Sequence, residues 1–344
     1  MKIGLIGYQG SGKSTLFEWL TGVPADPAHA HSGQSAMAQV PEPRLDELCK
    51  VYQPKKVVHA GLEIVDTPGL SRRHEGNAAR LALIREAGCM VLVLAAYDGS
   101  DPMADLRSLE EDLLLADMEI VSGRIGRIEE ALKKPLPRTE KEHLAHEEQT
   151  LKVVLAAMEE GRPLRGTDMT DEQRVVTRAF SLLSEKRRFL LVNTADDEEN
   201  PQRFVEAAPE GVPCWAVPVG LELELSRMSP EDRAEFEEEM GLAGTDKDHL
   251  IRSILEAAGQ LLYFTTSEKE VRAWVLPQGG TALEAADLVH TDLARGFIRA
   301  EVMTCEDLAR LGSEREVKAQ HLMRQEPKDY EVRDGDVLLI RFSV

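Results

Sequence analysis

The feature that most constrains the fold of this chain is the glycine-rich stretch GYQGSGKS at residues 7–14. Its spacing, one glycine, four residues and then Gly-Lys-Ser, is the pattern of a phosphate-binding loop. Glycines let successive backbone N–H groups face one anion, while the lysine reaches the β and γ phosphates and the serine hydroxyl ligates Mg²⁺. The predicted phosphate site comprises Gly10, Ser11, Gly12, Lys13, Ser14 and Thr15, with Lys13 as the catalytic residue.

The segments on either side of this loop fit the motif. Such a loop needs a buried strand before it and a helix after it, and the apolar stretch MKIGLI at 1–6 predicts the strand. STLFEWL at 14–20 predicts a helix, whose N-terminal dipole adds to the attraction for an anion. The alternative, a glycine turn followed by a chance lysine, is disfavoured because both flanking segments match.

A second motif, Asp66-Thr67-Pro68-Gly69, ends the strand that GLEIV predicts at 61–65. An aspartate at the carboxyl end of such a strand can hold the water shell of Mg²⁺, and a glycine N–H there can sense the γ phosphate. We therefore predict that Ser14 and Asp66 form a metal site and that Gly69 belongs to the phosphate site. Many GTPases have a water-orienting glutamine at the next position, where this chain has Leu70, so we expect slow turnover.

Apolar stretches alternate with helical ones along the first two thirds of the chain, which predicts a mostly parallel, doubly wound α/β sheet. Further strands are expected at 89–96, 188–193 and 214–219, and a helix at 77–86. The tetrapeptide NTAD at 193–196 stands where a GTPase carries its base-reading Asn-Lys-x-Asp. A polar turn is the alternative. The predicted base-binding residues are Asn193, Thr194, Asp196, Gly220 and Leu221.

A long polar insertion interrupts this alternation. Apolar residues recur at spacings of three and four over 105–132 and again over 144–158, with the break KKPLP between them. This pattern predicts an antiparallel coiled-coil hairpin whose longer arm spans roughly 40 Å at 1.5 Å per residue. The tip of the hairpin carries four cations: Lys133, Lys134, Arg138 and Lys141. They are either a contact for an acidic partner or a solvated turn.

The last eighty residues change character again. VRAWVLPQGGTALEAADLVH predicts a strand, a turn and a helix, and DYEVRDGDVLLIRF ends in another strand, which together indicate a small α+β module. It shows no recognisable nucleophile and base, so we interpret it as a binding domain. The predicted domains are a nucleotide-binding domain over 1–104 and 186–262, a helical insertion over 105–185 and the C-terminal module over 263–344.

Composition restricts the remaining function classes. The net charge of −20 argues against broad, sequence-independent DNA binding, which needs clustered Lys and Arg. The longest apolar run, at 89–97, is too short to span a membrane, and the apolar start is too short for a signal peptide, so we expect a cytoplasmic protein. Four widely spaced cysteines suggest neither a zinc site nor a disulfide framework.

Six stretches in sequence order carry a resemblance to a known family: GSGKSTLF, VPEPRLDEL, QPKKVV, YFTTSEKEVRAW, HTDLARGFIRAEV and DYEVRDGDVLLIRF. Together they resemble the YchF or Obg-like ATPase family of P-loop proteins over essentially the whole chain. The resemblance implies a G domain with an inserted helical hairpin and a C-terminal TGS domain of β-grasp fold. It also implies a preference for ATP over GTP and association with the ribosome or another translation factor.

The chain departs from that family in its loops. The family usually has Asn at the position of Gly10, and it has a switch I threonine between Thr21 and Val40 that is missing here; Ser32 or Ser35 are the candidate substitutes. The stretch after DTPGL is shorter than usual, so altered switch mechanics and a divergent paralogue are expected. The nearby His29 and His31 fit a solvated loop better than a metal site, because a third ligand is missing.

The choice of purine is the open chemical question. A carboxylate accepts hydrogen bonds from guanine but repels the bare N1 acceptor of adenine. Asp196 is a guanine-type acid, whereas Thr194 lacks the lysine of the GTPase motif. The resemblance favours ATP. The alternatives are a GTPase and a nucleotide-binding scaffold that hydrolyses nothing.

Overall fold

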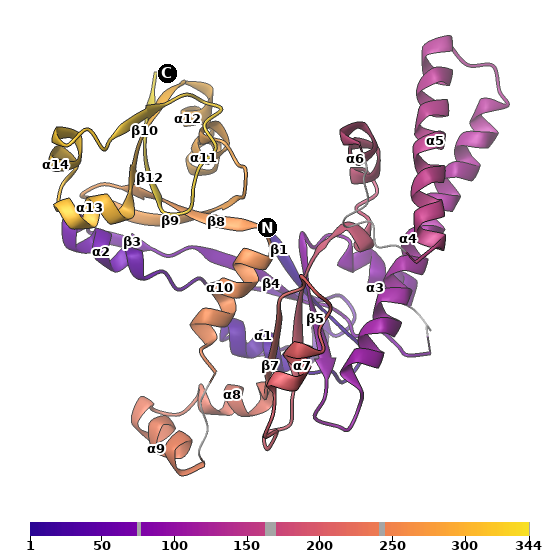
Figure 1. Ribbon diagram of the computed structural model, residues 1–344, viewed down its shortest axis with the longest axis horizontal. Helices are drawn as coiled ribbons and strands as arrows, with labels where there is room; N and C mark the ends of the chain where they lie inside the picture. The colour runs from indigo at the N-terminus through magenta and orange to yellow at the C-terminus, as the bar shows by residue number, and fades with distance from the viewer. Residues whose placement is uncertain (74–76, 162–169, 241–244, 344) are drawn as a thin grey trace. The chain divides into compact units, whose positions relative to one another are not determined.

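The structure, a computed structural model, describes residues 1–73, 77–161, 170–240 and 245–343 (Figure 1). The chain forms two compact units. The N-terminal unit contains 1–36 and 63–245, and the C-terminal unit contains 37–62 and 246–344. The predicted division into three domains has different boundaries and remains a prediction.

The first sheet has six strands in the order β2-β4-β1-β5-β6-β7. Its strands are β1 (Lys2–Ile6), β2 (Gln34–Gln39), β4 (Gly61–Asp66), β5 (Cys89–Ala95), β6 (Arg187–Asn193) and β7 (Cys214–Val217). The β4-β1-β5-β6-β7 pairs are parallel, and every residue of β5 is buried, as an apolar run in a sheet covered on both faces requires. The predicted α/β fold class is confirmed.

Short helices connect these strands or follow the last of them. They are α1 (Lys13–Thr21), the 3₁₀ turn η1 (Pro27–His29), α3 (Asn77–Ile84), α6 (Asp171–Arg178), η2 (Leu183–Glu185), α7 (Gln202–Glu206), α8 (Val219–Leu225) and α9 (Pro230–Met240). β4 and β5 lie on opposite sides of β1, so the order in which the chain adds strands to the sheet reverses at β1. Ligands bind at the carboxyl ends of strands at such a point, which is where the glycine-rich loop begins.

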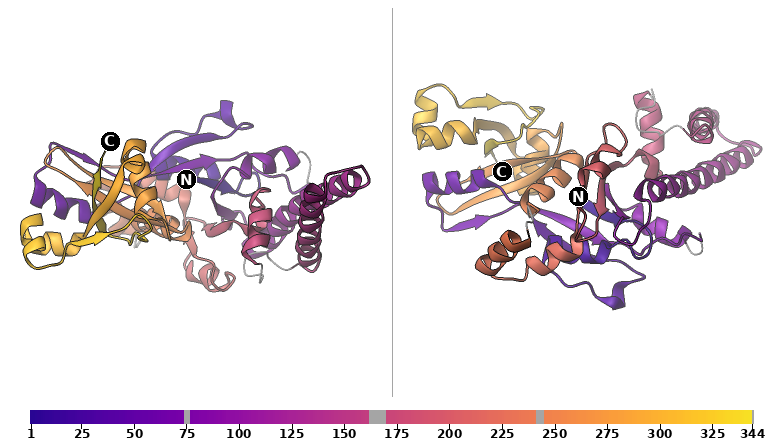
Figure 2. Two further views of the ribbon diagram at one scale, coloured as in Figure 1. Left: turned by 90° about the horizontal axis from the view of Figure 1, so that it is seen from above. Right: turned by 60° about the horizontal axis from the view of Figure 1, so that its bottom comes forward.

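The predicted helical hairpin is present as α4 (Pro102–Leu132) and α5 (Arg138–Glu159), which lie side by side in both Figure 1 and Figure 2. At 1.5 Å per residue, the 31 residues of α4 span about 46 Å. The first half of α4 packs on the sheet through Leu106, Leu109 and Leu113, whereas its second half shares a separate core with α5. The hairpin is thus anchored at one end by the main core of the N-terminal unit.

A buried carboxylate strengthens this anchor. The side chain of Asp117 on α4 is fully buried and pairs with Arg85 at 2.6 Å. It also accepts hydrogen bonds from the backbone N–H groups of Leu183 and Ser184 and from the Ser184 hydroxyl, at 2.7 to 3.0 Å. Both carboxylate oxygens of Asp117 thus have hydrogen-bond partners, and they join the hairpin to the segment that leads into β6.

The C-terminal unit contains a second six-stranded sheet in the order β11-β10-β12-β8-β9-β3. Its strands are β3 (Lys56–Val58), β8 (Gln260–Thr266), β9 (Glu270–Pro277), β10 (Phe297–Thr304), β11 (Arg324–Glu326) and β12 (Asp336–Phe342). Its helices are α2 (Pro43–Tyr52), α10 (Lys247–Ala257), α11 (Ala282–Val289), α12 (Thr291–Arg295), α13 (Cys305–Leu311) and α14 (Glu314–Ala319). The β8–β9 and β10–β12 pairs are antiparallel and the β12–β8 pair is parallel, the mixed α+β sheet expected of this module.

The segment 37–62 adds one strand and one helix to this second sheet. Strand β3 pairs in parallel with β9. On α2, the Tyr52 hydroxyl donates to Glu314 at 2.6 Å, and Arg44 pairs with Asp334 at 2.6 Å. In the described part of the chain, no helix is both long enough and apolar enough to cross a membrane.

Candidate nucleotide-binding site

The glycine-rich loop joins β1 to α1, and its glycines are required by its geometry. Gly10 and Gly12 have φ values of 82° and 94°, in the left-handed region that favours glycine. A Cβ on Gly7 would lie 2.3 Å from the Val93 carbonyl oxygen, and one on Gly12 would lie 2.2 Å from Nδ2 of Asn193. No side chain of residues 1–73, 77–161, 170–240 or 245–343 caps the N-terminus of α1, so its first amides are available to an anion.

Lys13 is buried inside this loop. Its Nζ donates a hydrogen bond to the Tyr8 carbonyl oxygen at 2.8 Å and lies 3.5 Å from the Ser11 hydroxyl. Burial lowers the pKa of Lys13 to about 8, against the opposing effect of the Asp66 carboxylate. A buried cation beside uncapped amides forms a positive cradle for a phosphate group.

Ser14 and Asp66 meet beside this cradle. The Ser14 hydroxyl donates to Oδ2 of Asp66 at 2.6 Å, and Oδ1 of Asp66 is buried and has no hydrogen-bond partner among the residues that the structure describes. Burial raises the pKa of Asp66, while the Ser14 hydrogen bond and Lys13 oppose that shift. A buried carboxylate oxygen without a partner, next to a serine hydroxyl, is an oxygen donor set that suits Mg²⁺ bound together with phosphates.

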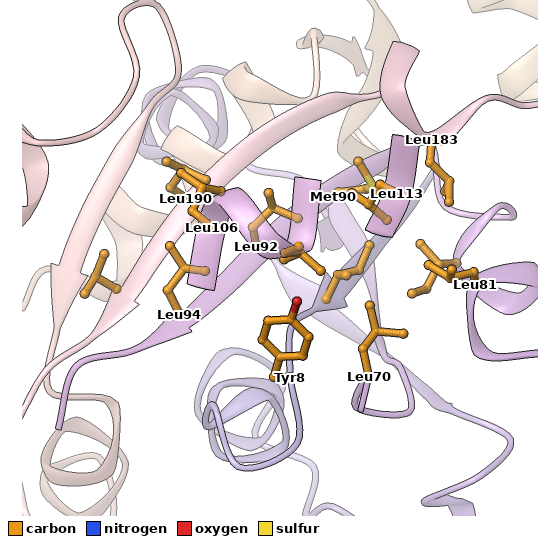
Figure 3. Close-up of a cluster of buried hydrophobic side chains, with 14 residues drawn as sticks. Tyr8, Leu70, Leu81, Met90, Leu92, Leu94, Leu106, Leu113, Leu183 and Leu190 are labelled. Carbon is orange, nitrogen blue, oxygen red and sulfur yellow. The ribbon is translucent and has the colours of Figure 1, made fainter. Parts of the chain in front are cut away.

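The loop that follows Asp66 is fastened to the glycine-rich loop by two backbone hydrogen bonds. Gln9 N–H donates to the Leu70 carbonyl at 2.9 Å, and Leu70 N–H donates to the Gly7 carbonyl at 3.0 Å. Gly69 fits tightly here, since a Cβ on it would lie 2.9 Å from the Cα of Gln9. The Leu70 side chain is fully buried next to Tyr8 in the core (Figure 3), so it does not face the phosphate site.

Tyr8 connects the two loops to the hairpin. Its hydroxyl donates to Oδ2 of Asp112 on α4 at 3.3 Å, and the guanidinium of Arg72 lies 5.0 Å from the centre of its ring. Arg72 in turn pairs with Asp105 on α4 at 2.5 Å. We call Tyr8, Arg72, Asp105 and Asp112 the hairpin link. No sequence pattern pointed to it, because these residues belong to three segments that meet only in the fold.

Asn193 joins the glycine-rich loop to the start of α8. It is buried, its Nδ2 donates to the Ser11 carbonyl at 3.2 Å, and its Oδ1 accepts from Val219 N–H at 3.0 Å. The next residue, Thr194, is also buried. The structure therefore brings the first predicted base-binding residue into contact with the phosphate loop.

The other predicted base-binding residues lie at the ends of neighbouring strands. Asp196 is exposed three residues after β6 ends, and its side chain reaches solvent. Gly220 and Leu221 form the first turn of α8, exposed and half-buried respectively, immediately after the Val219 amide that Asn193 holds. These positions share the carboxyl edge of the first sheet with the phosphate loop.

The segment predicted to contain switch I lies close to Asp66 at one point. A Cβ on Gly33 would be 3.2 Å from the Asp66 carbonyl oxygen, while the candidate substitutes Ser32 and Ser35 are exposed. His29 pairs with Asp26 at 3.2 Å. Across the described residues, no group of three or more His, Cys, Asp or Glu side chains is arranged to hold a metal ion.

Two family models match separate parts of the chain. One, described as a 50S ribosome-binding GTPase, matches residues 2–122. The other is named for the C-terminal domain of YchF GTPases, is described as a protein of unknown function, and matches residues 261–343. These matches cover the phosphate loop with its hairpin link and nearly all of the C-terminal sheet.

Curated relatives match over the full length. The "Ribosome-binding ATPase YchF" of Bacillus subtilis (strain 168) is 32% identical over 366 residues, which cover 99% of each chain. The "Obg-like ATPase 1" of Oryza sativa subsp. japonica is 33% identical over 371 residues, covering 100% of this chain and 92% of that protein. The solved structure of the Schizosaccharomyces pombe YchF GTPase, 24% identical, covers 99% of this chain and 97% of that chain with a TM-score of 0.83, which shows a shared fold. This chain therefore belongs to the family of YchF and Obg-like ATPases.

Proposed function

We propose that this protein is a slow P-loop nucleoside triphosphatase that prefers ATP to GTP and acts as a molecular switch for a ribosomal or other translation partner. The observation that carries this proposal is Oδ1 of Asp66, which lies buried beside Ser14 and Lys13 without a hydrogen-bond partner in the described part of the chain. Such an arrangement is unfavourable unless a cation and an anion complete it, because buried charge without a partner destabilises the folded state.

Each residue of the site has a distinct proposed role. Lys13 and the amides of Gly10 and Gly12 neutralise phosphate oxygens, assisted by the first turn of α1 at Thr15. Ser14 and Asp66 hold Mg²⁺, which supplies charge neutralisation at the β and γ phosphates when bound. The Gly69 N–H faces the γ phosphate. Loss of that phosphate on hydrolysis therefore releases the loop that contains Leu70 and Arg72.

The proposed slowness rests on Leu70. Its side chain is buried in the core and has no hydrogen-bonding atom, so it cannot orient an attacking water. The hairpin link supports a switch role, because Arg72 lies two residues beyond Leu70 and pairs with α4. A change in the loop after Gly69 can therefore reach the hairpin through a direct ion pair.

The preference for ATP is supported by the curated relatives, which are named ATPases. Thr194, buried and short, supplies no lysine to cover a guanine, whereas the exposed Asp196 keeps a guanine-type acid. A competition experiment separates the two purines: displacement of a fluorescent ATP analogue by Mg·ATP and by Mg·GTP. We expect Mg·ATP to compete more strongly. Stronger competition by Mg·GTP would support the GTPase alternative instead.

The partner is proposed from the names of the relatives, several of which are called ribosome-binding. A ribosomal partner would support our proposal that the protein acts in the cytoplasm. We further propose that the C-terminal sheet is a TGS domain and that α4 and α5 pair as a coiled coil, with their tip available for contact. The tip cations Lys133, Lys134, Arg138 and Lys141 are all exposed.

Reversing three tip charges, Lys133, Lys134 and Arg138 to Glu, should weaken co-sedimentation with ribosomes several-fold and leave nucleotide affinity unchanged. The tip pairs, such as Arg138 with Glu142 at 2.8 Å, are exposed, and exposed pairs contribute only about 0–1 kcal/mol, so these cations can turn to an anionic partner. A matched control reverses three cations on the shaft of the same hairpin, Arg107, Arg127 and Lys152. Equal loss in both variants would indicate a general charge effect, and no loss at moderate salt would exclude the tip as the contact.

A further inference from the structure

Tyr97 lies at the phosphate loop although it belongs to no motif. It is the second residue after β5, its side chain is largely exposed, and its hydroxyl donates a hydrogen bond to the Gly10 carbonyl oxygen. The space beside Gly10 is open, since a Cβ built on it would meet no atom of the described residues within 4 Å. Tyr97 thus contacts the loop at a residue whose φ of 82° favours glycine.

Three carbonyl groups of the loop are held by side chains. Lys13 Nζ holds the Tyr8 carbonyl, Tyr97 holds that of Gly10, and Asn193 Nδ2 holds that of Ser11. In a planar trans peptide the N–H points away from the C=O. Holding the Ser11 carbonyl therefore directs the Gly12 amide away from Asn193, toward the centre of the loop, where an anion binds. The Gly10–Ser11 peptide is itself fixed at both ends, because Tyr97 holds its carbonyl and its Ser11 N–H donates to the Tyr8 carbonyl oxygen at 3.2 Å.

The two outer supports come from adjacent strands. Ala95 and Asn193 are paired in the β5–β6 register, and the Ala96 N–H donates to the Asn193 carbonyl at 2.8 Å. Asn193 therefore stands at the paired end of β6, and Tyr97 stands in the turn that begins two residues beyond the paired end of β5. Such short connections to buried strands favour a preorganised binding site.

We propose that Tyr97 is a positioning residue for phosphate binding, whose hydroxyl fixes the Gly10–Ser11 peptide so that the loop amides face a di- or triphosphate. The proposal rests on the proposed function, because it assumes that the loop binds nucleotide phosphates. In this proposal the hydroxyl of Tyr97, and not its ring, positions the loop. A change confined to that oxygen therefore tests it.

The test is Tyr97→Phe, with the affinities for Mg·ATP, Mg·ADP and Mg·pyrophosphate measured by calorimetry alongside thermal unfolding. Loss of one neutral hydrogen bond should weaken all three ligands by about fivefold, and the midpoint of unfolding should stay within about 1 °C. Tyr52→Phe is the matched control, since it removes a tyrosine hydroxyl that donates to Glu314 in the C-terminal unit. It should leave all three affinities unchanged.

The three ligands separate the ways in which this proposal can fail. Weaker Mg·ATP binding with unchanged pyrophosphate binding would mean that Tyr97 acts on the nucleoside, which overturns a role in the phosphate loop. Unchanged affinity for all three ligands, or a lower unfolding midpoint that accounts for the loss, would also overturn it. If the parent protein itself binds none of the three, the proposed function fails first and the role of Tyr97 fails with it.

Discussion

Replacement of Lys13 by Ala should lower the affinity for Mg·ATP by about two orders of magnitude, the upper end of the range for charge-assisted hydrogen bonds. The Lys13 ammonium is buried, and burial has already lowered its pKa to about 8, so it carries little water that a phosphate must displace. A phosphate at the loop would add negative charge to that of the nearby Asp66 carboxylate. Any change in ribosome binding that depends on ATP should also disappear in the Lys13→Ala protein.

Titration calorimetry with Mg·ATP and Mg·ADP measures this loss. Lys247→Ala is the matched control, because burial also lowers the pKa of Lys247, which lies at the start of α10 in the C-terminal unit. We expect that variant to bind nucleotide like the parent. A Lys13→Ala protein that bound Mg·ATP as well as the parent would refute the assignment of this loop as the phosphate site.

Asp66→Asn should remove most of the effect of Mg²⁺ on ATP binding and at the same time stabilise the ligand-free protein. Carboxylates that support a bound metal ion through water typically contribute about 10- to 100-fold to its affinity, and Asn supplies no charge. Because burial raises the pKa of Asp66, its ionised form is disfavoured in the folded state. Stability is therefore lost as the pH rises through that raised pKa, so at neutral pH the neutral Asn is the more favourable residue.

Two measurements on this variant check both halves of the expectation. ATP affinity in Mg²⁺ is compared with that in EDTA, and thermal unfolding is followed without nucleotide. Asp98→Asn is the control: it changes an exposed carboxylate whose pKa the Ser100 hydrogen bonds lower. An undiminished effect of Mg²⁺ in Asp66→Asn would remove this residue from the metal site, and a less stable ligand-free protein would show that its carboxylate is satisfied without a ligand.

The parts of the fold that the sequence predicted are those encoded by local pattern. The buried strands β1, β5 and β6 are apolar runs, and the hairpin has apolar residues at helical spacing on two arms separated by a proline-containing break. The phosphate loop is a contiguous motif whose geometry follows from its glycines. Each of these features needs only neighbouring residues, so one sequence suffices to predict it.

The segment 37–62 shows what local pattern cannot supply. Strand β3 has only three residues, too few to show a period of two, and its partner β9 lies more than two hundred positions later in the chain. The sequence did contain VPEPRLDEL and QPKKVV there, but nothing in them indicates which sheet they join. Pairing over such a distance is decided by the packing of α2 and β3 in the C-terminal unit, through contacts such as Tyr52 with Glu314.

The candidate site also contains both residues that motifs predicted and residues that no motif indicated. Lys13, Ser14 and Asp66 were predicted from motifs, and the structure brings all three together. Tyr97 and the hairpin link were missed, because a single aromatic after a strand and a single arginine after Leu70 are common residues without spacing constraints. Asn193 was predicted to read a base; the structure shows it holding the Ser11 carbonyl, and base reading remains a prediction.

The rate of phosphate release from saturating Mg·ATP by the isolated protein shows whether it is a slow nucleoside triphosphatase. The buried Leu70, which cannot orient water, predicts a rate of about 10⁻³ per second or slower, with a Lys13→Ala sample as the blank. Release indistinguishable from that blank would instead support a scaffold that binds nucleotide without hydrolysing it. Turnover of about 1 per second or faster, the ordinary range of enzymes, would contradict the account of a slow switch that awaits its partner.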